Sequence, residues 1–256
     1  MVQNFPIASP LQGDPDDVNA QITIPTDTIR LDGKPLSFAD YVRIGSRRAL
    51  IVPEPAALER VHKAREVMED AISSGQPVYG ATTGVGAMKD ISWSEEELDA
   101  FSTGLVRAHH FGTGSAFPLE VVRNALAIRI NMALTGRVGC TPELVSAFQR
   151  LLDADVIPVV RRTGSIGCAD IGLMGQIGAV LTGVGEAYHS GERLPAAEAM
   201  ARAGLKPFKL APRDSLASVS TNAVGYAAAM RAIRQAATTV RVLLATGLTT
   251  AGALGA

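Results

Sequence analysis

The closing segment of the chain, residues 222–256, reads NAVGYAAAMRAIRQAATTVRVLLATGLTTAGALGA, and it decides the class of fold. Its alanine-rich pattern predicts one long α-helix. Arg231, Arg234 and Arg241 fall on one face, where we expect them to meet other subunits or solvent, and the other faces are apolar. A helix that is apolar over most of its circumference must be buried among other helices, so the segment indicates a helical bundle.

The rest of the chain supplies few helices to cover this one. Upstream, the apolar periodicity predicts helices over residues 56–75, 92–110, 119–136, 142–155 and a run from 171. A short strand or hairpin is expected at 22–33, a glycine-rich loop at 78–90, and a short hairpin with a helix at 191–205. We therefore expect the covering helices to come from other chains or from a second half of the protein.

Composition limits the class of protein. The chain has 256 residues, 47% of them hydrophobic, and a net charge of −1, which gives no field to recruit nucleic acid or anionic lipid. Two cysteines, Cys140 and Cys168, are too few for a disulfide framework and favour a reducing compartment. The N-terminus lacks a signal-peptide pattern, and no apolar run reaches the roughly 20 residues of a membrane span. We expect a cytoplasmic protein without nucleic-acid or membrane partners.

Several motifs in this order resemble one family. They are VYGATTGVGAMKD at 78–90, LVRAHHFGTG at 105–114, TGSIGCAD at 163–170 and PRDSLAS at 212–218. Together they are similar to the first half of the histidine, phenylalanine and tyrosine ammonia-lyases, the aromatic amino acid lyase family. The resemblance implies a mainly α, aspartase-like ammonia-lyase fold, with a small α+β N-terminal region followed by long bundle helices.

The same resemblance implies an oligomer whose active sites take residues from several chains. A full-length family member is about twice as long, so the chain is expected to be one subunit of a split enzyme, or truncated, or cut. The division expected is a mobile segment at 1–20, an active-site domain at 21–213 and the start of the central bundle at 214–256. A second chain supplying the C-terminal half is the expected partner, in a hetero- or homo-oligomer.

The loop at 163–170 departs from the family where its chemistry resides. Family members carry Ala-Ser-Gly there, which cyclises to an electrophilic methylidene-imidazolone (MIO) when the serine loses water. This chain has Cys168, Ala169 and Asp170, or, with a one-residue deletion, an Asp170 that matches the aspartate after the family's glycine. In the first alignment Ala169 holds the central position and has no leaving group, and the conclusion is the same in the second. We therefore expect no MIO and no other cofactor.

Other candidate residues follow from the motif matches. Tyr79 matches the family's catalytic tyrosine, an acid or base near the substrate β-carbon; the alternative is a tyrosine packed on glycines. Ala108 and His109 match the pair that sets side-chain selectivity, although His109 is equally explained as a satisfied histidine at a helix end. The remaining expected substrate-binding residues are Thr82, Gly84, Ser220 and Asn222, where Ser220 replaces the family's asparagine.

Three residues carry less specific alternatives. Cys168, in a glycine loop, is either a nucleophile or a small buried residue that fills the alanine slot. Asp170 is either a general base or the N-cap of the following helix. Adjacent His109 and His110 point about 100° apart on a helix, which makes them poor joint ligands, so no metal site is expected.

Three functions remain open. The first is an ammonia-lyase-like enzyme without MIO that performs acid–base elimination, addition or isomerisation on a small carboxylic or amino-acid-like substrate. In it Tyr79 moves a proton, Asp170 or His109 assists, and amides of the glycine loop hold an anion. The second is a non-catalytic scaffold or regulatory subunit of a split lyase-fold complex. The third is a true aromatic amino acid or histidine ammonia-lyase.

Overall fold

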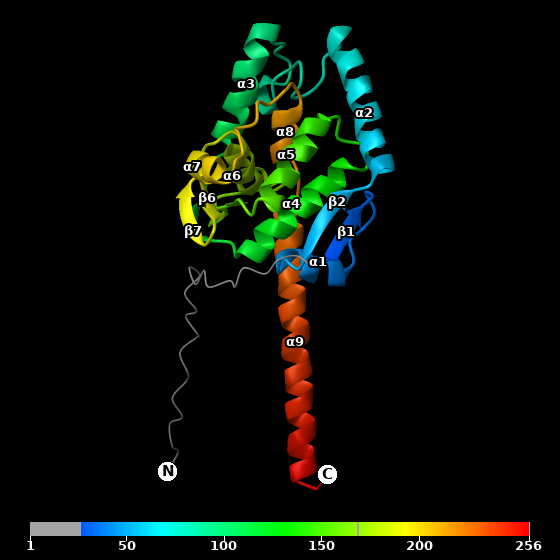
Figure 1. Cartoon of the computed structure of the whole chain (residues 1–256), viewed down its shortest axis with the longest axis vertical. Helices are drawn as coiled ribbons and strands as arrows, with labels where there is room; N and C mark the ends of the chain where they lie inside the picture. Colours follow the sequence, from blue (N-terminus) through cyan, green and yellow to red (C-terminus); the bar gives the residue numbers. More distant parts are fainter. Residues whose placement is uncertain (1–26, 168, 256) are drawn as a thin grey trace.

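The protein is mainly α-helical, as the sequence predicts (Figure 1). The computed structural model describes residues 27–167 and 169–255. The expected mobile segment at 1–20 lies outside the described residues. In chain order the main helices are α1 (Phe38–Gly45), α2 (Pro55–Ser73), α3 (Glu95–Ala108), α4 (Leu119–Ala133), α5 (Pro142–Asp153), α6 (Ile171–Leu181), α7 (Ala196–Arg202), α8 (Asp214–Val219) and α9 (Ala223–Ala253).

The strand expected within 22–33 is confirmed over 27–31, and residues 22–26 lie outside the described residues. β1 (Asp27–Leu31) pairs in parallel with β2 (Ala49–Pro53), and α1 lies between them in the chain. A parallel pair needs a crossover, and α1 provides it. Ser37 and Asp40 cap this helix reciprocally, each accepting from the other's backbone N–H. Of the two alternatives expected for this stretch, a strand or a hairpin, the described residues form the strand, and its partner comes after a helix.

α4 lies at the centre of the body and packs against α1, α5 and α9. Leu126 and Ile130 on this helix have no exposed surface. The start of α5 is as predicted: the Thr141 side chain accepts a hydrogen bond from the Leu144 N–H, and Pro142 occupies the first turn. α4 thereby joins α1 of the N-terminal unit to α5 and to the long helix α9.

Small sheets complete the body. The predicted hairpin is β6 (Glu186–His189) with β7 (Glu192–Pro195), followed by α7 and extended on its other edge by β4 (Ile157–Pro158). β3 (Thr113–Ala116) pairs antiparallel with β5 (Arg161–Thr163). This second pair brings the segment after α3 next to the loop that precedes α6.

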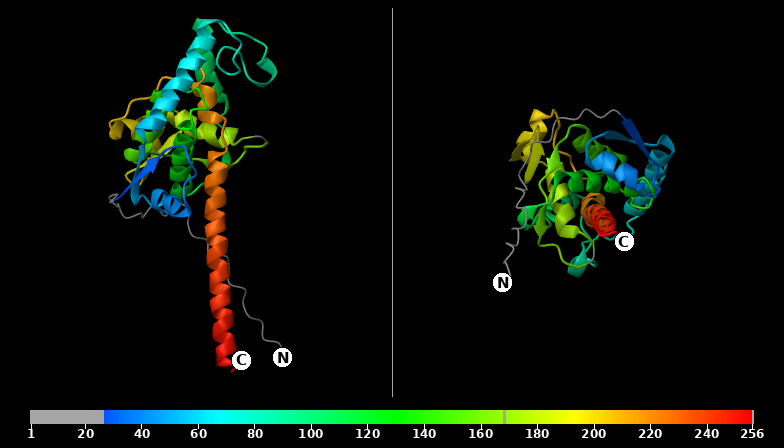
Figure 2. Two further views of the ribbon diagram at one scale, coloured as in Figure 1. Left: turned by 90° about the vertical axis from the view of Figure 1, so that its right-hand side faces the viewer. Right: turned by 90° about the horizontal axis from the view of Figure 1, so that it is seen from below.

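The long helix expected from the closing segment is α9, which leaves the body as a single rod (Figures 1 and 2). Its first turns are held by the body. Ala223, Val224 and Ala227 are completely buried, and the Tyr41 hydroxyl donates to the Ala227 carbonyl at 2.7 Å. Burial raises the pKa of the Tyr41 phenol to about 12, so it remains a donor at physiological pH.

The expectation for the bundle arginines is wrong for two of the three. Arg231 and Arg234 both pair with Glu120 of α4 inside this chain, Arg231 through Nε at 2.5 Å and Arg234 through Nη2 at 3.1 Å. Glu120 lies in the first turn of α4, and its two ion pairs place it beside α9. Only Arg241 is left without such a pairing among the three.

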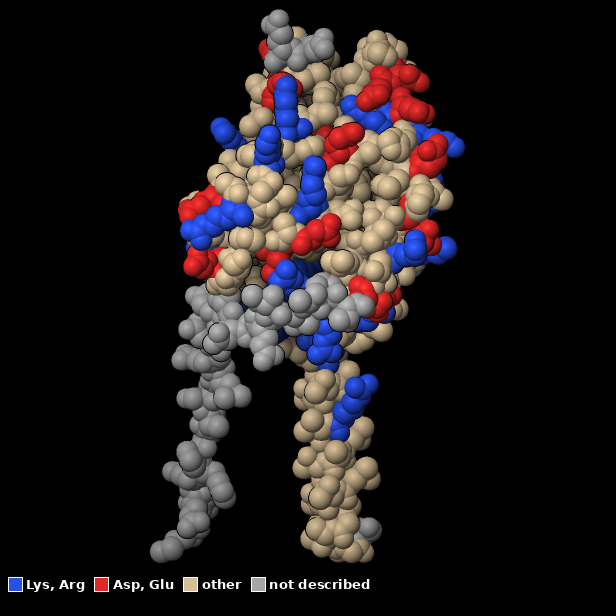
Figure 3. Space-filling view, in the orientation of Figure 1, with Lys and Arg blue, Asp and Glu red and all other residues tan. Residues whose placement is uncertain are grey.

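The outer part of α9 is exposed on all sides and almost uncharged. From residue 235 to 250 every residue is exposed, and Arg241 is the only charged residue from 235 to 255. Figure 3 shows this projecting rod as nearly free of charged side chains. Four large apolar residues share one face within about 80° of helix circumference. These residues, named here the α9 stripe, are Ile233, Val240, Leu244 and Leu248.

None of the described helices combines the length and the apolar character needed to cross a bilayer. The expected division at residue 213 remains a prediction, although α8, which follows it, packs against α3 and α6.

Candidate active site

Tyr79 belongs to a compact loop, residues 76–93, between α2 and α3. Short bridges join Tyr79 to Thr83 and Thr83 to Ser92. The Tyr79 ring is half exposed, and its hydroxyl accepts a hydrogen bond from the Gly86 N–H at 3.0 Å. The phenol oxygen is therefore held by its own loop while the ring remains open to solvent on one side.

The other residues expected to bind substrate in this loop serve the loop itself. The Thr82 hydroxyl donates to the Gln76 carbonyl at 2.8 Å and accepts from the Val78 N–H at 2.7 Å. At Gly84 an added Cβ would lie 2.4 Å from the Met88 carbonyl oxygen, so only glycine fits.

The predicted use of the loop amides as an anion holder is not supported. The Gly80, Gly84 and Gly86 N–H groups donate to Thr83, Ile91 and Tyr79 respectively. All three acceptors belong to the same loop, because a tight turn closes by pairing its backbone groups internally. The loop presents Tyr79 rather than an anion site.

His109 caps the end of α3, as one of the two expectations has it. Its Nδ1 lies 2.7 Å from the Leu105 carbonyl, which makes Nδ1 the protonated nitrogen and leaves Nε2 as an acceptor in the neutral ring. Ala108 is the last residue of α3 and is exposed. α3 packs closely on α6 here: an added Cβ at Gly175 would lie 2.1 Å from the His109 carbonyl oxygen. This close backbone contact fixes the position of His109 relative to α6.

The loop before α6 projects from the body, as the light-green segment in the left panel of Figure 2. Ile166 in this loop is 95% exposed. The Ser165 hydroxyl accepts from the Gly172 N–H at 3.2 Å, so Ser165 caps the first turn of α6. Ala169 has φ +60°, a left-handed conformation that costs a non-glycine residue roughly 1–2 kcal/mol. Cys168 lies outside the described residues.

Asp170 occupies the N-cap position of α6, but its side chain caps a different helix. It makes no capping bond to α6, and its Oδ2 accepts from the Gly225 N–H at 2.5 Å in the first turn of α9. Its own N–H donates to the Thr221 carbonyl at 2.9 Å. Because Ser165 serves α6, the Asp170 carboxylate is free to hold the positive end of α9. These contacts favour a structural role over the predicted general base.

Ser220 and Asn222 flank Thr221 in the three-residue connection between α8 and α9. Both are exposed, whereas Thr221 is buried. The Asp170–Thr221 hydrogen bond places this connection beside the loop before α6. Two of the predicted segments therefore meet, and Ser220 and Asn222 are available to a ligand.

α8 links the Tyr79 loop to the remaining segments. Near its start, Arg213 Nη1 donates to the Tyr79 carbonyl at 2.9 Å. Near its end, Ser218 packs on Gly178 of α6, where an added Cβ would lie 3.1 Å from the Ser218 hydroxyl. Sequence reasoning missed Arg213. The available signal was a basic residue between a proline and an aspartate at a helix start, which does not reveal a contact with a residue 134 positions away.

Three buried polar or ionisable groups lie in α4, α8 and the segment before α5: Arg129, Asp214 and Cys140. Asp214 has no exposed surface; burial raises the pKa of its carboxyl, and hydrogen bonds from Thr141 and Ala211 oppose that rise. Burial also raises the pKa of the Cys140 thiol to about 11, so Cys140 stays a neutral, unreactive thiol near pH 7. Arg129 is 3% exposed, and among the described residues its Nε has no hydrogen-bond partner.

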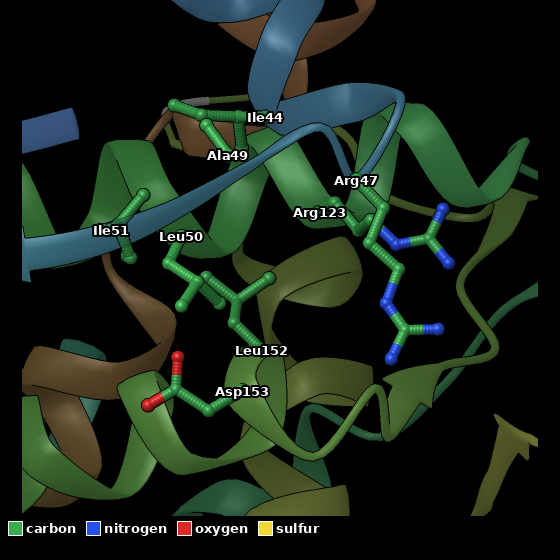
Figure 4. Close-up of a pocket in the computed structure, with 8 residues that line it drawn as sticks. All are labelled: Ile44, Arg47, Ala49, Leu50, Ile51, Arg123, Leu152 and Asp153. Carbon is green, nitrogen blue, oxygen red and sulfur yellow. The ribbon is translucent and has the colours of Figure 1, made fainter. Parts of the chain in front are cut away.

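A small cavity elsewhere is structural. Its volume is about 70 Å³, and it lies between the α1–β2 connection and the helices α4 and α5 (Figure 4). In Figure 4 the guanidinium groups of Arg47 and Arg123 point the same way, and both pair with Asp155 at 2.8 Å. None of the predicted site residues lines it. Across residues 27–167 and 169–255, no group of three or more His, Cys, Asp or Glu side chains forms a metal-binding cluster.

The body is mainly helical, and the α8 segment contacts both the Tyr79 loop and α6. Residues 36–256 match the aromatic amino acid lyase family, and the chain belongs to that family. It is 34% identical over 193 residues to histidine ammonia-lyase of Stigmatella aurantiaca, covering 75% of this chain and 38% of that protein. The chain thus spans well under half the length of the curated relatives it matches.

Solved structures agree. Ergothionase from Treponema denticola, an ergothioneine-degrading enzyme in complex with desmethyl-ergothioneine sulfonic acid, superposes with a TM-score of 0.79 and 36% identity. That match covers 81% of this chain and 42% of ergothionase. Histidine ammonia-lyase from Trypanosoma cruzi has a TM-score of 0.75 at 24% identity, over 82% of this chain and 40% of that one, which shows a shared fold.

Removing the Asp170 carboxylate tests its contact with α9. We expect Asp170→Ala to lower the free energy of unfolding by about 1–2 kcal/mol, because the Gly225 N–H loses a charged acceptor. Asp170→Asn keeps an acceptor and should lose less. Urea denaturation measures the effect, with Asp90→Ala as the control, since Asp90 is exposed and pairs with Lys89. An Asp170→Ala midpoint equal to wild type would contradict the capping role.

Proposed function

We propose that the protein containing this chain is a lyase that works without MIO. The observation that carries the proposal is the loop at 169–170. Ala169 offers a methyl group where ring formation needs a hydroxyl that leaves as water. The backbone nitrogen of Asp170, which would have to attack, donates instead to Thr221, and its carboxylate is committed to Gly225. These residues do not fit the group, so no step is routed through it.

Without an electrophile, the substrate itself must carry a good leaving group. An unactivated primary amine leaves poorly, whereas a quaternary ammonium leaves as a neutral amine with the bonding electron pair. Ergothionase, which is 36% identical in the aligned region, degrades ergothioneine, a histidine betaine with a trimethylated amine. This similarity supports elimination from a betaine or a similarly activated small carboxylate over deamination of a free amino acid.

In the proposed reaction Tyr79 is the general base and takes a proton from the carbon next to the one that bears the leaving group. The C–H electron pair becomes the second bond of a C=C, and the amine departs with the electrons of the C–N bond. His109 and Ala108 would face the substrate side chain, with the His109 Nε2 free to accept a hydrogen bond. Ser220 and Asn222 would face its polar end.

The covalent state of residue 169 is the first test. We expect the intact mass of the chain to equal that of its unmodified sequence, and peptides across 163–172 to show no loss of water, because alanine has no hydroxyl to eliminate. A deficit of one water located at 168–170 would contradict the proposal. It would favour the third function, a mainstream ammonia-lyase.

Turnover by the native assembly is the second test, with ergothioneine and histidine as probes. We expect release of trimethylamine from the betaine, and a fall in kcat of about 10²- to 10⁴-fold in Tyr79→Phe, because a general base is lost. Tyr41→Phe is the matched control: it loses one buried hydrogen bond to Ala227 and should keep its turnover. Full turnover in Tyr79→Phe would remove the role of Tyr79, and no turnover in wild type would favour the non-catalytic subunit.

We also infer that a second polypeptide segment, supplying the rest of the lyase fold, covers the outer part of α9. The α9 stripe supports this, since burying each of its four side chains contributes roughly 1.5–3 kcal/mol. A face of this kind is typical of helix–helix interfaces. The partner proposed is either a separate chain or a further part of the same protein.

A charge placed in the α9 stripe tests this interface. We expect Leu244→Lys to reduce the assembled fraction in sedimentation velocity, because a lysine would have to be desolvated in the contact. Gln235→Lys, on the opposite face of the same helix, should assemble as wild type. Equal assembly of both variants would argue against a partner on the α9 stripe.

A further inference from the structure

Arg213 connects two segments that are remote in sequence. Its Nε donates to the Val138 carbonyl at 3.1 Å, in the connection between α4 and α5. Its Nη1 donates to the Tyr79 carbonyl at 2.9 Å. One planar guanidinium thus holds two backbone carbonyls that belong to different parts of the body.

The backbone that carries this guanidinium is fixed from the other side. Arg213 has φ +80°, a conformation rare for residues with a side chain. The next residue, Asp214, is fully buried and accepts from the Thr141 N–H at 2.9 Å and the Thr141 hydroxyl at 2.8 Å. Breaking such buried bonds is costly, so the strained turn is maintained by its surroundings.

The α8 segment also holds the residue after Tyr79. Gly80 has φ +67°, and a Cβ added there would lie 2.5 Å from Leu216 Cδ2. The Leu216 side chain therefore packs directly on the Gly80 backbone. Tyr79 is restrained at its carbonyl by Arg213, at the adjacent Cα by Leu216, and at its hydroxyl by Gly86.

We propose that Arg213 is the positioning residue of Tyr79, setting the place of the phenol oxygen through its hydrogen bond to the Tyr79 carbonyl. The inference rests on the proposed function for its catalytic consequence. A general base has to lie within hydrogen-bond reach of the proton it takes, and a displacement of about 1 Å can cost about 10²-fold in rate. Arginine suits the task because lysine presents its donors from a single nitrogen and cannot span both carbonyls in the same way.

The test compares Arg213→Met, Arg213→Lys and Arg60→Met in the native assembly. Arg60 is the matched control, since its guanidinium also binds backbone carbonyls, those of Leu134, Ala56 and Asp32, in another part of the fold. Three quantities are measured: hydrogen exchange of the amides at 78–86, and kcat and KM with the betaine probe.

We expect Arg213→Met to speed exchange at 78–86 by about tenfold or more, with the remaining core protected. We expect kcat to fall about 10²-fold with little change in KM, because the substrate contacts persist. Arg213→Lys should restore part of both, and Arg60→Met should change neither. Arg213→Gly is the second variant: glycine adopts φ +80° without strain, so it removes the guanidinium and relieves the backbone.

Unchanged exchange at 78–86 in both Arg213→Met and Arg213→Gly would overturn the inference alone. A rise in KM with kcat preserved would also overturn it, since that would make Arg213 a binding residue. If Tyr79→Phe keeps full turnover, the proposed function and the catalytic consequence of Arg213 fall together, and the exchange data still decide whether Arg213 holds the loop.

Discussion

The hydrogen bond from the Gly225 amide to the Asp170 carboxylate fixes the relation between the candidate site and the long helix. A carboxylate is well placed at the N-terminus of α9, where the helix presents unpaired N–H groups and partial positive charge. The same residue binds Thr221 through its backbone N–H. The loop before α6, the α8–α9 connection and the root of α9 are therefore joined at one residue.

The short helix α8 connects the segments that carry the candidate site residues. Although it has only six residues, all of them are buried, and it packs against both α3 and α6. Arg213 at one end binds the Tyr79 carbonyl, and Ser220 follows at the other end. The α8 segment contacts both the Tyr79 loop and α6, so a displacement of one can reach the other through α8.

Periodicity and capping signals predicted most of the fold. The Thr141-Pro142 start of α5 and the apolar pattern of α9 were sufficient because both are local. The parallel pairing of β1 with β2 was not predictable, since it depends on a crossover helix. At the site, motif matches identified Tyr79 and Asp170, but which helix Asp170 caps is decided by tertiary packing. The role of Arg213 was not predicted for the same reason, because its hydrogen-bond partners are distant in sequence.

The exposed outer part of α9 affects how long the chain persists in the cell. Its root is tied down by contacts within the body, so the body folds with the first turns of the helix in place. The distal turns then expose leucine and valine side chains with a single arginine for solubility, the kind of surface that chaperones and proteases select. Under the proposed interface, the abundance of the chain should therefore follow the supply of the segment that covers the outer part of α9.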